Sequence, residues 1–420
     1  MRQQSLADDL RENELAPGFV GPAWQDYCFA NIPDTVLSLF DGDADRPLPE
    51  TVFENVTTDI DNVVLAFIDG LGWNHFQRVR HDHSFLTRLV NHATVTPLTA
   101  GYPSATAAAV STIHTGRQPV EHGVIGWNTY VESLGGHIQT LPFANSERTP
   151  LGEVRENPNP ADLLDGPTLY ERLDARSVLI QPTEIGGNPY DSQATRGADL
   201  INYENPAQAA CRVRTQLEET IEPTYYYCYF PSVDGFSHAH GAAHEETDAQ
   251  LENISHAIER EIVEKLDSAV AKRTLLLVIA DHGEVDTSSN ERVNIDTSDL
   301  ETHLQRDKHG EPIPMLGSPR NLQFHARDGH RDALRTKLED VFAPLDPLIL
   351  DREGIIDESI FGNKEPSERF ERRCPDLLVI PRNGFARDND SDLTKIGMHG
   401  GLHPDEMLVP FAAARIDTLQ

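Results

Sequence analysis

Seven side chains that can bind metal ions fall in five short motifs of this sequence. Each motif lies where an apolar run ends or where glycines allow a tight turn, and α/β folds bring such positions together at the carboxyl edge of the sheet. Three carboxylates, three imidazoles and one hydroxyl suit a pair of divalent cations, so the sequence predicts a two-cation phosphoryl-transfer site. The seven residues are Asp69, Thr106, Asp234, His238, Asp281, His282 and His399.

Two of the motifs place carboxylates directly after apolar runs. Asp69 follows the run 63–68 and precedes a glycine-rich turn, and Asp281 and His282 follow the run 275–280. A carboxylate and an imidazole at such a strand end can reach one cation from a single loop. The alternative is that each aspartate only caps the turn or helix that follows it.

Thr106 is the candidate nucleophile. Pro103 and Ser104 predict the start of a small-residue helix that ends near Gly116. Thr106 would then lie in the first turn, where free N–H groups and the helix dipole favour a phosphate. A coordinated cation would lower the pKa of its hydroxyl and make it nucleophilic. The alternative is that Ser104 and Thr106 only cap the helix.

The third motif pairs Asp234 with His238, and this spacing puts both side chains on one side of a turn, where they can bind one cation. His240 and His244 lie close by in the sequence. We interpret these two histidines as supporting or surface residues rather than ligands.

The last motif is a histidine flanked by glycines. His399 lies within Gly397-Met398-His399-Gly400-Gly401, and the nearby His403 is the rival candidate. Because the glycines allow close backbone approach, we expect His399 to be the ligand.

The elements that must position these residues are four apolar runs, 63–68, 225–230, 275–280 and 377–380. Stretches with helical spacing, such as 244–271, separate them. Strands that alternate with helices predict an α/β fold with a mostly parallel central sheet sandwiched by helices.

The sequence predicts one catalytic domain over residues 61–420, with an acidic N-terminal extension, 1–60, packed on it. Two segments, 131–200 and 286–330, are rich in Gly, Pro, Asn and Ser and lack strong periodicity. We expect them to form cap or insert segments that face the substrate.

The charge of the chain is strongly negative, with a formal net charge of −33 at pH 7. Only six of its 35 basic residues are lysines. Acid-rich, lysine-poor surfaces suit concentrated salt, where screening weakens self-repulsion, so we expect a halophilic host. A polyanionic surface disfavours nucleic acid or an anionic membrane as a standing partner.

Targeting and cysteine signals are weak. No stretch approaches the ~20 apolar residues that span a bilayer, and the first residues are polar, so we expect a cytoplasmic protein. The four cysteines are widely spaced without a CxxC pair, which supports neither a zinc knuckle nor a disulfide framework.

Taken together, the motifs resemble those of the alkaline phosphatase superfamily, and most closely its nucleotide pyrophosphatase/phosphodiesterase branch. The resemblance spans residues 60–411 and implies an alkaline phosphatase-like core. The matching segments are FIDGLGW (67–73), YPSATAAAVSTIHTGRQPVEHGVIGWN (102–128), VDGFSHAHG (233–241), ADHGE (280–284) and MHGG (398–401).

The resemblance also implies a role for each residue. The cation that activates the nucleophile would be held by Asp69, Thr106, Asp281 and His282. The second cation would be held by Asp234, His238 and His399. Asn128, at the end of the turn after the nucleophile helix, matches an asparagine that binds a phosphate oxygen in this branch. One departure concerns the substrate: many members carry Pro-Asn where this chain has Ala108-Ala109.

The predicted activity is hydrolysis of phosphate diesters or nucleotide pyrophosphate bonds through a covalent phosphothreonine at Thr106. No arginine or lysine occurs in the nucleophile motif before Arg117, which favours a transferred group with one negative charge. We expect two divalent cations, zinc in the first place, with manganese or iron as alternatives. The expected partner is a small phosphate ester or nucleotide, and the sequence leaves the oligomeric state open.

Several alternatives remain on the same residues. A phosphomonoesterase or a phosphonoacetate-type phosphonate hydrolase would use the same ligand set. A sulfatase is disfavoured because the nucleophile position holds threonine, and a metal-dependent phosphoglycerate mutase would need a longer inserted domain. From another class, the chain could be a non-catalytic metal-binding protein.

Overall fold

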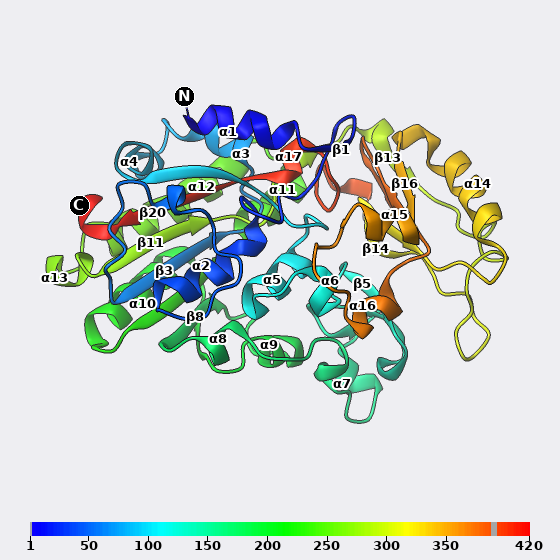
Figure 1. Cartoon of the computed structure of the whole chain (residues 1–420), viewed down its shortest axis with the longest axis horizontal. Coiled ribbons are helices and arrows are strands. Elements are labelled where there is room, and N and C mark those ends of the chain that lie inside the picture. Colours follow the sequence, from blue (N-terminus) through cyan, green and yellow to red (C-terminus); the bar gives the residue numbers. More distant parts are fainter. Residues whose placement is uncertain (1, 388–392) are drawn as a thin grey trace.

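The computed structural model describes residues 2–387 and 393–420, and a seven-stranded sheet runs through its larger part (Figure 1). Neighbouring strands are parallel except β20, which is antiparallel to both of its neighbours. In spatial order the strands are β4 (Thr94–Thr99), β20 (Leu408–Arg415), β11 (Thr274–Ile279), β3 (Asn62–Ile68), β10 (Thr224–Phe230), β8 (Arg176–Pro182) and β9 (Asp199–Tyr203).

The central strands are apolar because helices cover both faces of the sheet. Every residue of β3, β10 and β11 is buried. The helices pack in two groups that cover the sheet (Figure 1). One group is α4 (Ser84–His92), α10 (Pro206–Glu219) and α12 (Glu245–Ala257), and the other is α2 (Ile32–Leu39), α5 (Thr106–Thr115) and α8 (Leu169–Arg172). The predicted α/β fold, a mostly parallel sheet between helices, is confirmed.

A second, wholly antiparallel sheet lies at the right of Figure 1, beyond α5 and α6 (Pro119–His122). Its own apolar cluster includes Phe324 of β15 (Asn321–Phe324), and Leu338 and Phe342 of α14 (Arg331–Phe342). In spatial order its strands are β16 (Leu348–Asp351), β17 (Leu377–Ile380), β15 (Asn321–Phe324), β14 (Leu316–Ser318), β5 (Asn128–Val131), β6 (Gly136–Gln139) and β7 (Ala144–Asn145).

The apolar run 377–380 therefore lies outside the central sheet. As β17 it pairs antiparallel with β15 and β16. Its four residues are all buried, as in the central strands, so a short apolar run predicts a buried strand without indicating which sheet contains it.

The two segments expected to form inserts contribute to different parts of the fold. Segment 131–200 supplies β6 and β7 to the second sheet and β8 and the start of β9 to the central one. Segment 286–330 supplies β14 and β15, and also β13 (Arg292–Asn294), which pairs with β18 (Phe385–Arg387).

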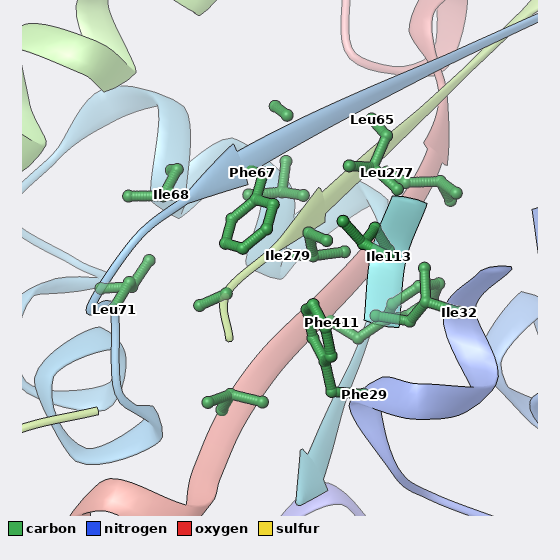
Figure 2. Packing of buried hydrophobic residues seen from close by; sticks show 14 of the residues in the cluster. Phe29, Ile32, Leu65, Phe67, Ile68, Leu71, Ile113, Leu277, Ile279 and Phe411 are labelled. Carbon is green, nitrogen blue, oxygen red and sulfur yellow. The ribbon is translucent and has the colours of Figure 1, made fainter. Parts of the chain in front are cut away.

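The N-terminal segment packs on the central sheet. It contains α1 (Arg2–Arg11), the ribbon of β1 (Glu14–Ala16) and β2 (Phe19–Val20), and α2. Figure 2 shows Phe29 and Ile32 of this segment beside Ile113 of α5 and strand residues such as Phe411. Burial of these large side chains joins the segment to the main core.

The remaining elements are short. The helices are α3 (Trp73–Val79), α7 (Leu151–Val154), α9 (Pro189–Ala194), α11 (Ser232–His240), α13 (Ser268–Ala271), α15 (Arg352–Asp357), α16 (Glu368–Arg373) and α17 (Pro404–Met407), and the last ribbon joins β12 (Val285–Asp286) to β19 (Gly397–Met398). No helix among the described residues combines the length and apolar character that crossing a bilayer requires. All four cysteines are free.

Candidate active site

Three predicted carboxylates meet at the carboxyl edge of the central sheet. Asp69 and Asp281 follow the neighbouring parallel strands β3 and β11, and the Gly70 N–H donates to Asp281 Oδ1 at 3.3 Å. Asp234, in the first turn of α11, donates its N–H to the Asp69 carbonyl at 3.1 Å. Gly70 has a φ of 77°, and a Cβ there would lie 2.8 Å from the Asp234 Cα. Only glycine therefore allows this approach.

The three predicted histidines face these carboxylates. His282 Nε2 lies 3.4 Å from both Asp69 Oδ1 and Asp281 Oδ2. His238 Nε2 and His399 Nε2 lie 3.6 and 3.5 Å from Asp234 Oδ1. The rings of His282 and His399 stack at a centroid distance of 3.7 Å, so the two groups of side chains are contiguous.

A backbone carbonyl group fixes the ring orientation of each of these histidines. Nδ1 lies 2.8 to 3.1 Å from a backbone carbonyl, which requires an N–H at Nδ1 and leaves Nε2 as the free lone pair. The acceptors are the carbonyls of Gly397 for His238, Ser104 for His399 and Gly283 for His282. Burial also lowers the pKa of His238 and His399. This orientation and neutral state are those of metal-binding imidazoles.

Thr106 is the first residue of α5, and its Oγ1 lies 3.3 Å from His282 Nε2. The residue at the N-cap is Ala105, and no side chain caps this helix. Ser104 instead donates to the Gly401 carbonyl at 2.8 Å and so holds the loop that carries His399. The Thr106 hydroxyl therefore faces the imidazole cluster rather than the helix end, and α5 ends before Gly116 as expected.

Several buried carboxylate oxygens in this cluster have no hydrogen-bond partner among the described residues. They are Asp69 Oδ1, Asp234 Oδ1 and Asp281 Oδ2. Burial, together with the charges of Asp281 and Asp234, raises the pKa of Asp69 well above its ordinary value, and burial also raises the pKa of Asp281. Because a divalent cation would compensate such charges, the donor set fits metal ions.

A cavity of about 520 Å³ opens over Thr106. Asp234, His238 and His399 form part of its wall. The rest of the wall includes one aromatic and three cationic side chains, Trp127, Arg148, Arg387 and Lys395. A small anionic molecule with a planar group would fit the chemistry of this lining.

The sequence profile of the type I phosphodiesterase / nucleotide pyrophosphatase family matches residues 63–402. The chain belongs to this family. The predicted resemblance is thereby confirmed, and it places the chain among the phosphoester hydrolases. No curated protein sequence gives a significant match.

Solved structures of the alkaline phosphatase superfamily share the fold. An inactive variant of murine ectonucleotide pyrophosphatase/phosphodiesterase 5, solved with AMP, aligns with a TM-score of 0.59 at 15% identity, over 84% of this chain and 87% of that one. Phosphonoacetate hydrolase from Sinorhizobium meliloti 1021, solved with phosphonoformate, aligns with a TM-score of 0.58 at 15% identity, over 86% and 95%. At these identities the likeness concerns the fold alone.

Asn128, which family resemblance assigns to the phosphate, lies beside the cavity over Thr106 rather than in its wall. Its Oδ1 accepts from His137 Nε2 at 3.0 Å, and its Nδ2 lies 3.5 Å from the Gly317 carbonyl. Asn128 lines a neighbouring cavity that shares Arg148 and Arg387 with the first. The contact between Asn128 and a phosphate oxygen stays a prediction.

The rival histidines lie elsewhere. His403 is the N-cap of α17, where its Nδ1 accepts from the Asp405 N–H at 3.1 Å. His240 and His244 stack on each other at 5.2 Å near Glu246, in a separate group at the surface.

Sequence reasoning missed two buried residues of this site. The Tyr229 hydroxyl donates to Asp69 Oδ2 in a short hydrogen bond, and Glu284 places a carboxyl oxygen near Asp234, His282 and His399. Tyr229 was hidden in an apolar run, where a tyrosine is read as a core residue. Glu284 directly follows the Asp281-His282-Gly283 motif, so its position was a usable signal.

Proposed function

We propose that the chain is a hydrolase of phosphate diesters or nucleotide pyrophosphate bonds that uses Thr106 as nucleophile and two divalent cations. The observation that carries this proposal is the cluster of buried carboxylate oxygens without partners, which faces three Nε2 lone pairs next to the Thr106 hydroxyl. Membership of the family supports the reaction class.

The residues fall into two neighbouring ligand sets, and His282 lies close to both. We assign one cation to Asp69, Thr106, Asp281 and His282, and the other to Asp234, His238 and His399. When bound, the pair would lower the pKa of the Thr106 hydroxyl and offset the charge that develops on the two apical oxygens. Zinc suits this mixture of ligands, as manganese or iron would.

The protein groups perform the remaining tasks. Thr106 Oγ1 attacks phosphorus, the P–O bond to the leaving group breaks, and water then hydrolyses the phosphothreonine from the vacated side. The first turn of α5 presents backbone N–H groups to the non-bridging oxygens. Asn128 would add a phosphate contact once its side chain turns from the Gly317 carbonyl.

A second candidate is favoured by the cationic wall of the cavity. Arg148, Arg387 and Lys395 suit a substrate with a further negative charge, such as a monoester or a carboxylate-bearing phosphonate. The nucleophile motif itself has no cationic side chain before Arg117, whereas these three cations come from segments that follow it in the sequence. The two similar structures bind AMP and phosphonoformate, which supports a small anionic substrate.

The surface charge supports a proposal about the setting. We place the enzyme in the cytoplasm of a halophilic organism, acting on small molecules without a standing nucleic-acid or membrane partner. The halophilic setting and the lack of a polyanionic partner rest on the excess of 68 acidic over 35 basic residues.

The test compares two chromogenic substrates in molar salt with added zinc or manganese. Hydrolysis of bis-p-nitrophenyl phosphate should exceed that of p-nitrophenyl phosphate, and both a chelator and Thr106→Ala should abolish it. Thr106→Ser should retain part of the rate because it keeps a hydroxyl. Thr115→Ala, at the other end of α5, is the matched control and should leave the rate unchanged.

Each other outcome changes the assignment. A preference for the monoester would move the enzyme to the second candidate on the same site. Full activity of Thr106→Ala would refute the nucleophile. Bound metal without turnover of either ester or of phosphonoacetate would favour a non-catalytic metal-binding protein.

A further inference from the structure

The feature that the proposed ligand sets leave unused is Glu284. Its side chain is buried, with 6% of the residue exposed, and its carboxyl group lies against the Asp234 carboxyl group, while no N–H or hydroxyl group among the described residues donates to either of its oxygens. One of its oxygens lies within 4.8 Å of ligand atoms of Asp234, His282 and His399. A carboxyl group in such a place either keeps its proton or is offset by a nearby positive charge such as a bound cation.

The backbone fixes Glu284 in this place. Glu284 directly precedes β12, whose Val285 pairs with Met398 of β19. Continued by one residue, this antiparallel register sets Glu284 opposite His399. The ribbon that carries the histidine therefore also carries the glutamate.

Gly283 allows the same loop to pack closely against the backbone of Asp405 and Glu406. Its N–H donates to the Glu406 carbonyl at 2.9 Å, and a Cβ on Gly283 would lie 2.0 Å from the Asp405 carbonyl oxygen. This close contact with the Asp405–Glu406 backbone fixes the start of the loop that carries Glu284.

Glu284 approaches the cluster from a different side than Thr106 does. It lines a separate cavity of about 470 Å³, together with Gly70, Gly72 and Asp286. Thr106, Asp234 and His399 line the cavity described above. We call the cavity lined by Glu284 the rear cavity. A cation ligand on that side would leave the side of the cation that faces Thr106 open to substrate.

We propose that Glu284 is an additional carboxylate ligand of the second cation, beside Asp234, His238 and His399. This inference rests on the proposed function, since it presumes that the site binds two divalent cations. It adds a fourth protein ligand to that cation and gives a role to a buried carboxyl group that lies against the Asp234 carboxyl group. The resulting ligands are two oxygens and two nitrogens, a mixture that suits zinc or manganese.

The experiment measures metal binding rather than turnover. Chelator-treated wild type, Glu284→Gln and Glu284→Asp are titrated with Zn²⁺ or Mn²⁺ in competition with a chromophoric chelator, and their melting temperatures are recorded with and without metal. Glu291→Gln is the matched control, because Glu291 lines the same rear cavity but belongs to none of the candidate ligand groups of the described residues.

Wild type and the control should bind two cations per chain. Glu284→Gln should bind one cation as wild type does and the other at least about tenfold less tightly, since even residues that only support ligands contribute about 10–100-fold. Without metal it should melt no lower than wild type, because a buried negative charge is gone, and its gain in melting temperature with metal should be smaller. Glu284→Asp should fall between the two.

The outcomes separate the two proposals. A wild type that binds no divalent cation refutes the proposed function. Two cations bound equally tightly by wild type and Glu284→Gln refute only the role of Glu284, as would be expected if its carboxyl simply kept a proton. A Glu284→Gln protein that melts lower than wild type without metal identifies a structural role and refutes the ligand role.

Discussion

Removal of Arg320 should strongly destabilise the protein. Arg320 and Glu406 are both completely buried and form a bidentate ion pair. Arg320 Nε donates to Glu406 Oε1 and Nη2 donates to Oε2, both at 2.8 Å. Arg320 also donates to the carbonyls of Pro381 and Gly384. The pair thus joins the β14–β15 turn to the segment before β20.

The expected cost follows from what the substitution leaves behind. In Arg320→Met, Glu406 would keep only the N–H groups of Gly401 and His403 as donors, at 2.7 and 3.0 Å. Breaking one partner from a buried ion pair typically costs about 3–5 kcal/mol. That is a large share of the roughly 5–15 kcal/mol that stabilises a folded protein. The double variant Arg320→Met/Glu406→Gln removes both charges and should recover part of the loss.

Urea denaturation in molar salt, with fluorescence as the probe, measures these differences. The control is Arg260→Met, which breaks an exposed pair with Glu264 at 2.7 Å and should leave the stability nearly unchanged, because solvent screens such a pair. A loss below about 1 kcal/mol for Arg320→Met, or a double variant less stable than the single one, would refute the reasoning from buried charge.

Three further predictions concern the site and the surface. Tyr229→Phe removes the hydroxyl that donates to Asp69 and should weaken binding of the first cation by about 10–100-fold in a chelator competition; unchanged affinity would count against this hydrogen bond. Arg148→Ala should raise KM about tenfold or more with a smaller change in kcat, because this side chain lines the cavity but lies off the nucleophile; an effect on kcat alone would contradict it. The melting temperature should rise from 0.1 to 2 M NaCl, as screening shortens the range of repulsion among acidic groups, and a fall would speak against the halophilic proposal.

The sequence predicted the central sheet because its strands are buried on both faces. The runs ending at Ile68, Phe230 and Ile279 are continuous and apolar, and the polar residues that follow them had to emerge at one edge. Asp69, Asp234 and Asp281 lie together for this reason, whereas Thr106, His238 and His399 come from α5, α11 and the segment after β19. The local pattern of strand, carboxylate and glycine predicted the carboxylates, and the resemblance to the family implied the ligand sets.

The second sheet could not be predicted in the same way. Its strands are short, and the wall that Arg148 and Arg387 add to the cavity comes from residues far apart in the sequence. Arg148 lies in the turn that begins at Asn145 and lines the same cavity as Thr106. The residues around Arg148 give no sign of this position. Such contacts depend on how two sheets pack, and a single sequence carries no local signal for that.

The position of β20 in the central sheet affects how the protein folds during its synthesis. This strand follows all others along the sequence, yet it lies between β4 and β11, inside the central sheet. A nascent chain that has not reached residue 408 therefore has two unpaired strand edges facing a gap, which are open to mispairing. The loop that carries His399 immediately precedes this strand. The site can thus assemble only after synthesis has passed residue 408, and a nascent chain that ends earlier should be unable to cleave a phosphate ester.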